Sequence, residues 1–153
     1  MPTTISTEEL AALPGRELAA SEWLEITQER VNQFADATND HQFIHIDEAL
    51  AKATPFGGTI AHGFLSLSLI THLIADTMPV PEGCQMTINY GSDKVRYLTP
   101  VRVGKRIRAQ QTVLEAAEKQ PGRWLVKTAV TIEIENEETP AVIAEILFMH
   151  FAA

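Results

Sequence analysis

An aspartate and a histidine five residues apart are the side chains of this sequence best suited to acid–base chemistry. They lie in the segment Asn39-Asp40-His41-Gln42-Phe43-Ile44-His45, in a region that holds three of the five histidines. A carboxylate and an imidazole held by one loop can share a water molecule, with one side chain removing a proton and the other supplying one. Asp40 and His45 are therefore candidate catalytic residues. The spacing alone also permits a structural interpretation, in which Asp40 ends a helix and His45 is a buried, hydrogen-bonded residue.

A second candidate feature is the pair His62-Gly63, where a helix is expected to begin. The first peptide N–H groups of a helix have no partner within the helix and carry partial positive charge, so they attract anions. Gly63 would let a ligand carbonyl approach closely and so offers an oxyanion hole, unless the glycine only permits a tight loop. Ser68 is either part of this site or a core hydroxyl bonded to a carbonyl one turn earlier.

Basic side chains gather in one stretch of a chain that is acidic overall. Six of the 12 lysines and arginines lie between residues 94 and 108, where there is no acidic residue. Such a stretch attracts anionic ligands, and Arg96 is one candidate contact. The alternative is a solvated strand face opposite the acidic residues of 133–138.

The first half of the chain has the hydrophobic spacing of helices. Three helices are expected, over 27–38, 48–53 and 60–77. Thr27 and Asp47 are suited to cap the first two. A cluster of helix-breaking residues at 54–59 precedes the third, which is apolar nearly all round. We expect that long helix to be surrounded by other elements.

The second half of the chain has the pattern of strands. Apolar and polar side chains alternate most clearly over 124–135, as in an antiparallel strand with one exposed face. Further strands are expected over 23–26, 84–90, 93–98, 105–115 and 141–151. The economical architecture is α+β, with one curved antiparallel sheet wrapped around one long central helix in a single domain, 1–153. The last strand is apolar on both faces, which suggests a covering second subunit and hence a homodimer.

Composition excludes several classes of protein. The 20 acidic and 12 basic residues give a formal net charge of -8 and a pI of about 5.0, which disfavours nucleic-acid binding. The lone Cys84 excludes an intrachain disulfide. No signal-peptide pattern is visible, and the longest apolar stretch, 60–75, is shorter than the roughly 20 residues that a membrane span needs. We expect a cytoplasmic protein with no membrane partner.

Three motifs in this order resemble the MaoC-like dehydratases, a family that includes R-specific enoyl-CoA hydratases and NodN-like proteins. Asp40 and His45 keep the separation of that family's Gly-Asp-x-Asn-Pro-x-His motif. Ile60-Ala61-His62-Gly63-Phe64, followed by Ser68, is similar to its apolar-x-His-Gly helix start. The later strand motif is matched by Asn89-Tyr90-Gly91, Lys94-Val95-Arg96-Tyr97 and Pro100-Val101-Arg102-Val103-Gly104. The resemblance covers most of the chain.

The resemblance implies the hot dog fold, paired as a dimer, and the reversible addition of water to a trans-2-enoyl thioester to give the R-3-hydroxyacyl thioester. It implies no metal and no redox cofactor, coenzyme A being part of the substrate. Carried over, Asp40 and His45 activate the water, the Gly63 N–H polarises the thioester carbonyl, and Ser68 supports the dyad. His62, Phe43, Phe64 and Arg96 are the residues expected to contact substrate, Arg96 at the phosphates of coenzyme A.

The loop departs from the family motif at three positions. Asn39 replaces the family glycine, which is tolerable because asparagine is among the non-glycine residues most often found at positive φ. Phe43 replaces the proline and is expected to line the acyl pocket, and Gln42 replaces asparagine. These changes bear on loop geometry and on acyl chain length more than on the type of reaction.

Three other functions remain open from the sequence. A hot dog thioesterase would direct a carboxylate-activated water at the thioester carbonyl itself. A metal enzyme would use histidines and aspartates that are close in sequence. Its candidate ligands would be Asp36, Asp40, His41, His45 and Asp47. A non-catalytic module would bind the acyl thioester without turnover.

Overall fold

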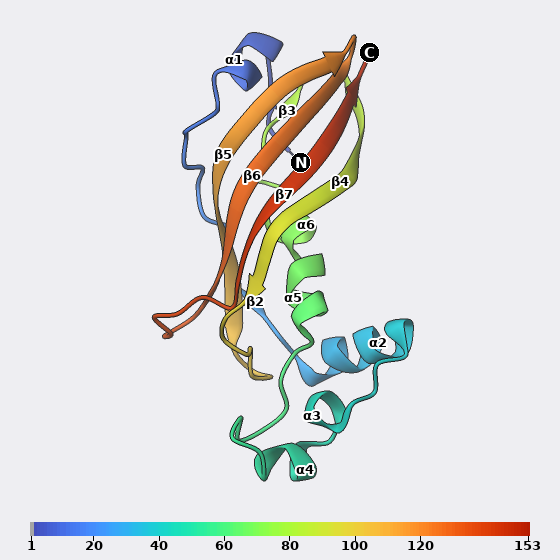
Figure 1. Ribbon diagram of the computed structural model, residues 1–153, viewed down its shortest axis with the longest axis vertical. Helices are drawn as coiled ribbons and strands as arrows, with labels where there is room; N and C mark the ends of the chain where they lie inside the picture. The colour runs from blue at the N-terminus through green and yellow to red at the C-terminus, as the bar shows by residue number, and fades with distance from the viewer. Residues whose placement is uncertain (1) are drawn as a thin grey trace.

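A five-stranded antiparallel sheet forms the body of the molecule (Figure 1). The computed structural model describes residues 2–153. The strand order is β2-β5-β6-β7-β4, and the strands are β2 (Leu24–Glu25), β4 (Cys84–Tyr97), β5 (Arg106–Gln120), β6 (Arg123–Ile134) and β7 (Val142–Ala152). Figure 1 shows the four long strands curling along one side of the helices α5 (Gly63–Ser68) and α6 (Ile70–Leu73). This curved sheet around a central helix is the hot dog arrangement that the resemblance implies.

The alternating pattern of β6 places its apolar side chains against the central helix. Val126, Val130 and Ile132 are at most 1% exposed, whereas Lys127 and Thr131 are half-buried on the outer face. The turn that joins β5 to β6 requires a glycine, because Gly122 has a φ of 73° and a Cβ there would lie 2.5 Å from the Ala152 carbonyl oxygen.

The central helix is shorter than expected and is interrupted at Leu69. Residues 60 and 61 instead pair with other segments, since the Ile60 and Ala61 N–H groups donate to carbonyl oxygens of Ile44 and Val101. The sequence led us to expect a helix surrounded by other elements, but within the single chain one face of the helix is uncovered. It packs Leu65 and its neighbours on the sheet, but its outer face is exposed. That face carries Phe64, Ser68, Thr71 and His72.

Short helices precede the central helix: α1 (Thr7–Ala11), α2 (Gln28–Thr38), α3 (Phe43–Ile46) and α4 (Glu48–Lys52). Both expected caps are confirmed, because the Thr27 hydroxyl accepts from the Arg30 N–H at 3.2 Å and the Asp47 carboxylate from the Leu50 N–H at 3.0 Å. A small parallel pair, β1 (Thr4–Ile5) and β3 (Val80–Pro81), and the helix α1 were not expected. No helix among the described residues is long and apolar enough to cross a membrane.

The two strands expected over 84–90 and 93–98 are one continuous strand, β4, whose pairing with β7 shifts register near Gly91 and Lys94.

The pairing of β5 with β6 gives two arginines of the basic stretch acidic partners. Arg106 pairs with Glu135 and Arg108 with Glu133 across the two strands. The structural alternative for this part of the basic stretch is therefore confirmed.

His150 on β7 is a buried titratable group, only 1% exposed. Its Nδ1 lies 2.7 Å from the Thr87 hydroxyl, and burial lowers its pKa to about 4. The unfolded chain binds a proton at the ordinary value of 6.5, so between pH 6.5 and pH 4 the unfolded state binds more protons than the folded state. Acid therefore favours unfolding in this window.

We expect the free energy of unfolding to fall on acidification from pH 7 to pH 4.5, with His150 contributing about 2 to 3 kcal/mol of the loss. Urea unfolding at the two pH values measures it. The variant His150→Phe keeps a buried ring without the titration, so its loss over the same range should be smaller by about that amount. An equal loss in both proteins would contradict the assignment.

Candidate active site

Asp40 and His45 are positioned by the chain reversal that ends α2. Asn39 adopts the left-handed conformation with a φ of 58°, as anticipated for an asparagine in place of glycine, and turns the chain out of the helix. Asp40 follows and remains about half exposed, whereas His45 lies on the single turn of α3 and is 7% exposed. A carboxylate oxygen of Asp40 and a ring nitrogen of each of His45 and His62 lie within 4.8 Å of one another.

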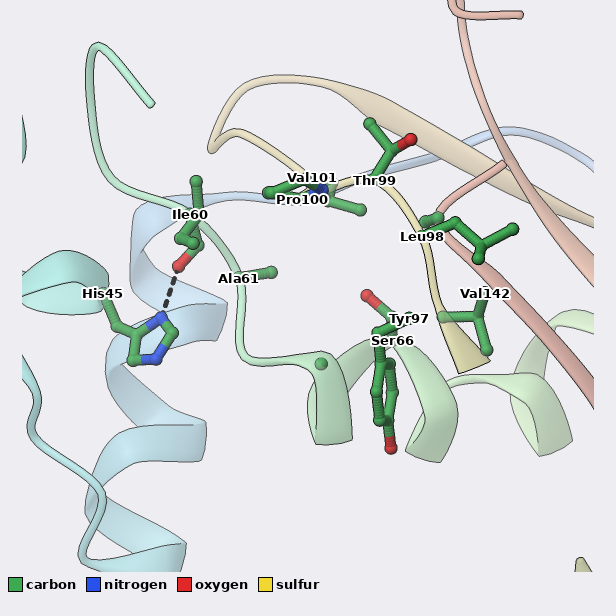
Figure 2. A pocket seen from close by; sticks show the side chains of 12 residues that line it. His45, Ile60, Ala61, Ser66, Tyr97, Leu98, Thr99, Pro100, Val101 and Val142 are labelled. Carbon is green, nitrogen blue, oxygen red and sulfur yellow. Dashed lines mark hydrogen bonds between the residues drawn. The ribbon is translucent and has the colours of Figure 1, made fainter. Parts of the chain in front are cut away.

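The hydrogen bond of His45 decides which ring nitrogen is free. Its Nδ1 lies 2.7 Å from the Ile60 carbonyl oxygen, as Figure 2 shows. Because a carbonyl only accepts, Nδ1 carries the proton and Nε2 keeps its lone pair. Burial lowers the pKa of His45, and the neighbouring His62 lowers it further, against the opposing effects of the Ile60 hydrogen bond and the Asp40 carboxylate. At neutral pH the ring is therefore an uncharged base.

His62 contacts both Asp40 and His45. It is 3% exposed, and its Nε2 donates to the Asp40 carbonyl oxygen at 2.9 Å. Its ring stacks on His45 with centroids 3.7 Å apart and planes inclined by 22°. As the residue that precedes α5, His62 ties the Asp40 loop and the His45 ring to the start of the central helix.

A cavity of about 240 Å³ opens beside His45, at the start of α5 (Figure 2). His45, Gly63, Ser66 and Tyr97 line it together with apolar residues of the segment 98–101 and of 141–142. A Cβ on Gly63 would lie only 2.9 Å from Cδ1 of the Tyr97 ring, so the ring covers this glycine closely. The cavity thus combines an imidazole, a helix start and apolar walls.

The structure brings together some of the residues expected from the sequence and separates others. His45 and Gly63 line the cavity, and the Asp40 carboxylate lies close to the His45 ring. Ser68 faces a different groove, beside Asn89 of β4. The roles assigned to all of these residues stay predictions.

The four residues expected to contact substrate are also dispersed. Phe43 is 42% exposed at the start of α3, and Phe64 is exposed against the edge of Tyr97. Arg96 is exposed on β4, where its guanidinium donates to the Val95 carbonyl oxygen. His62 is buried within the wall of the site.

Ser66 and Tyr97 line the cavity but were not among the site residues expected from the sequence. Ser66 is 2% exposed and lies one helical turn after His62, so its position on the helix face was available from the spacing. Tyr97 stands in the strand motif, but no pattern in the sequence signalled its contact with Gly63, because that contact depends on how the end of β4 lies against the helix.

The metal-ligand set considered from the sequence does not assemble. His41 is bonded to Asp36 at 2.8 Å, and Asp47 caps α4. Asp40, His45 and His62 do lie close together, but the lone pair of an imidazole lies in the plane of its ring. Two stacked rings therefore do not direct their lone pairs at one ion about 2.0 Å from each. The donor geometry does not fit a shared metal.

Comparison with known proteins places the chain in a family. The model of the MaoC like domain matches residues 9–137. The 3-hydroxyacyl-thioester dehydratase Z of Mycobacterium tuberculosis is 43% identical over 99% of this chain and 100% of its own length. Nodulation protein N of Rhizobium meliloti is 44% identical over 92% of this chain and 88% of its own.

A solved structure agrees with these relatives. The unliganded R-hydratase from Pseudomonas aeruginosa superposes with a TM-score of 0.74 at 29% identity, covering 99% of this chain and 89% of that one. The chain therefore belongs to the MaoC-like dehydratases, and it is a hydro-lyase with the hot dog fold.

Proposed function

We propose that the protein is an R-specific enoyl-CoA hydratase, which adds water reversibly to a trans-2-enoyl-CoA to give the (R)-3-hydroxyacyl-CoA. The observation that carries the proposal is the His45 ring, whose Nε2 keeps its lone pair and which lies close to the Asp40 carboxylate and lines the cavity with Gly63. The apolar walls suit an acyl chain, and the mostly hydrophobic lining with a few polar groups is typical of a ligand site.

In the proposed reaction a water molecule lies between Asp40 and His45. One of the two accepts its proton while the oxygen forms a bond to the β-carbon of the enoyl thioester. The electron pair of the double bond moves to the thioester oxygen as an enolate, and the accepted proton then goes to the α-carbon. Base assistance contributes about 10²- to 10⁴-fold to the rate.

The Gly63 N–H is proposed to donate to the thioester oxygen as negative charge develops there. Each such donor contributes roughly 2.7 to 4 kcal/mol to transition-state stabilisation. Ser66, rather than the more distant Ser68, is the hydroxyl that shares the cavity with His45 and Gly63. Arg96 is kept as a proposed contact for the coenzyme A phosphates, and no metal or redox cofactor enters the proposed reaction.

We also propose a homodimer formed through the outer edge of β4. That edge has no strand partner among residues 2–153, because β4 ends the sheet. Exposed apolar side chains accompany it: Phe64, Met86, Ile88, Tyr90, Tyr97 and Leu98. Apolar exposure along a free edge is typical of an interface. Sedimentation equilibrium should give twice the mass of 16.9 kDa, and Ile88→Asp should yield monomer.

The single cysteine supports the proposal of a cytoplasmic site of action.

The test of the function is the loss of absorbance of the conjugated thioester when crotonyl-CoA, and then octenoyl-CoA, is mixed with the protein. Chiral analysis should identify the R-3-hydroxyacyl product. Release of free coenzyme A thiol from a saturated acyl-CoA would indicate a thioesterase instead. Binding without turnover of any of these thioesters would indicate a binding module, and either result would overturn the proposal.

A further inference from the structure

Gln28, the first residue of α2, contacts the backbone that carries His45. Its Nε2 donates to the His45 carbonyl oxygen at 2.7 Å and also to Oδ1 of Asn32 at 2.9 Å. Its Oε1 lies 2.7 Å from the Thr59 hydroxyl, which donates to it. One amide side chain therefore joins the helix α2, the turn α3 and the segment that leads to His62.

Thr59 makes this junction rigid from the other side. It is 2% exposed, and its N–H donates to the Glu48 carboxylate at 2.9 Å. Its hydroxyl lies 2.8 Å from the same carboxylate, so its one proton is shared between Glu48 and Gln28. These bonds lower the pKa of Glu48, so the carboxylate stays charged. The next residue is Ile60, whose carbonyl accepts the Nδ1 proton of His45 and whose N–H donates to Ile44.

We propose that Gln28 is a positioning residue for the dyad, acting through both ends of the His45 to Ile60 hydrogen bond. It holds the carbonyl of His45 directly, and it holds the carbonyl of Ile60 through Thr59. We call the hydrogen bonds of Gln28 to the His45 carbonyl and to Thr59 the Gln28 bridge. The distance between Nδ1 of His45 and the Ile60 carbonyl oxygen, and hence the tautomer and direction of the ring, depends on this bridge. The inference rests on the proposed function for its catalytic consequence, but not for its structural one.

Removal of the Gln28 amide leaves the His45 carbonyl without this donor and leaves the Thr59 hydroxyl with Glu48 as its remaining side-chain acceptor. Water then replaces the amide at these buried groups. The groups that face His45 are the His62 ring and the Asp40 carboxylate, while Glu48 acts through Thr59. Gln28 is uncharged, so none of these charges changes. The pKa of His45, which burial lowers, should consequently rise toward its ordinary value of 6.5 as water enters.

The test uses Gln28→Met, which keeps the length of the side chain and removes its hydrogen bonds. NMR titration of the His45 ring proton, assigned by its loss in His45→Gln, should show a higher pKa than in the wild-type protein. The matched control is Asn32→Ala, since Asn32 contacts Gln28 but no group of the dyad in the described structure. It should leave the titration unchanged. We expect kcat of Gln28→Met to fall about 10- to 100-fold, with a smaller change in KM.

An unchanged His45 titration in Gln28→Met would overturn the proposal. If that variant does not fold, Thr59→Val removes the hydroxyl that links Gln28 to the Ile60 segment and should raise the same pKa. The titration needs no turnover, so its result is separate from that of the hydratase assay. A raised pKa in a protein without hydratase activity would support the bridge and overturn only the proposed function.

Discussion

Asp40→Asn is expected to lower kcat by at least about 10²-fold, since asparagine keeps the shape of the side chain but accepts no proton at neutral pH. The carboxylate is about half exposed, so the free energy of unfolding should change by less than about 1 kcal/mol. Spectrophotometric hydration of crotonyl-CoA measures the rate, and urea unfolding measures the stability.

The matched control is Asp36→Asn, four residues earlier, whose carboxylate is exposed and paired with His41 outside the site. It should keep the wild-type rate. His45→Ala should lose at least about 10²-fold in kcat as well, because it removes the Nε2 lone pair. A rate near that of the wild type in either dyad variant would remove the assignment of Asp40 and His45.

Gly63→Val is expected to lower kcat/KM by about 10²- to 10³-fold while leaving a folded protein. The new Cβ would lie 2.9 Å from the Tyr97 ring, and its two methyl groups would stand where the thioester carbonyl is proposed to approach. Tyr97 is 47% exposed, so its ring has room to turn toward solvent. Overpacking of this kind costs about 1 to 3 kcal/mol of stability.

Gly63→Ala with Tyr97→Ala is the informative companion variant. Removal of the ring relieves the steric contact at Gly63, so stability lost in Gly63→Ala alone should be regained in the pair. Activity should stay below that of Tyr97→Ala alone, because the methyl group still crowds the N–H. Proportional losses of activity and stability across these variants would indicate that Gly63 serves only the packing of the helix start.

Relationships between near neighbours in the chain were predictable. The caps Thr27 and Asp47, the positive φ of Asn39 and the alternation of β6 all depend on a few adjacent residues. The closeness of Asp40 to His45 belongs to this class too, because five residues separate them, while their catalytic roles stay predictions. Motif resemblance then supplied the fold and the type of reaction, which the comparisons support.

The ends of the central helix show where local patterns fail. Residues 60 and 61 are as apolar as those that follow, yet Ile60 and Ala61 are held by backbone hydrogen bonds to Ile44 and Val101. A periodic hydrophobic pattern does not show whether a backbone N–H donates within a helix or to a distant segment. Within the single chain the outer face of the helix is exposed, and apolar Phe64 on that face lies against Tyr97 at the open edge of the sheet.

By itself, then, the sequence determined which side chains could act and which elements would carry them, because hydrogen-bonded caps and hydrophobic periodicity are local. Tertiary structure decided the chemical state of the site. The free nitrogen of His45 is set by the Ile60 carbonyl, 15 residues away, and the bridge from Gln28 spans 17 residues. Tautomer, burial and pKa depend on partners brought close by packing, and such partners leave no regular spacing in a chain.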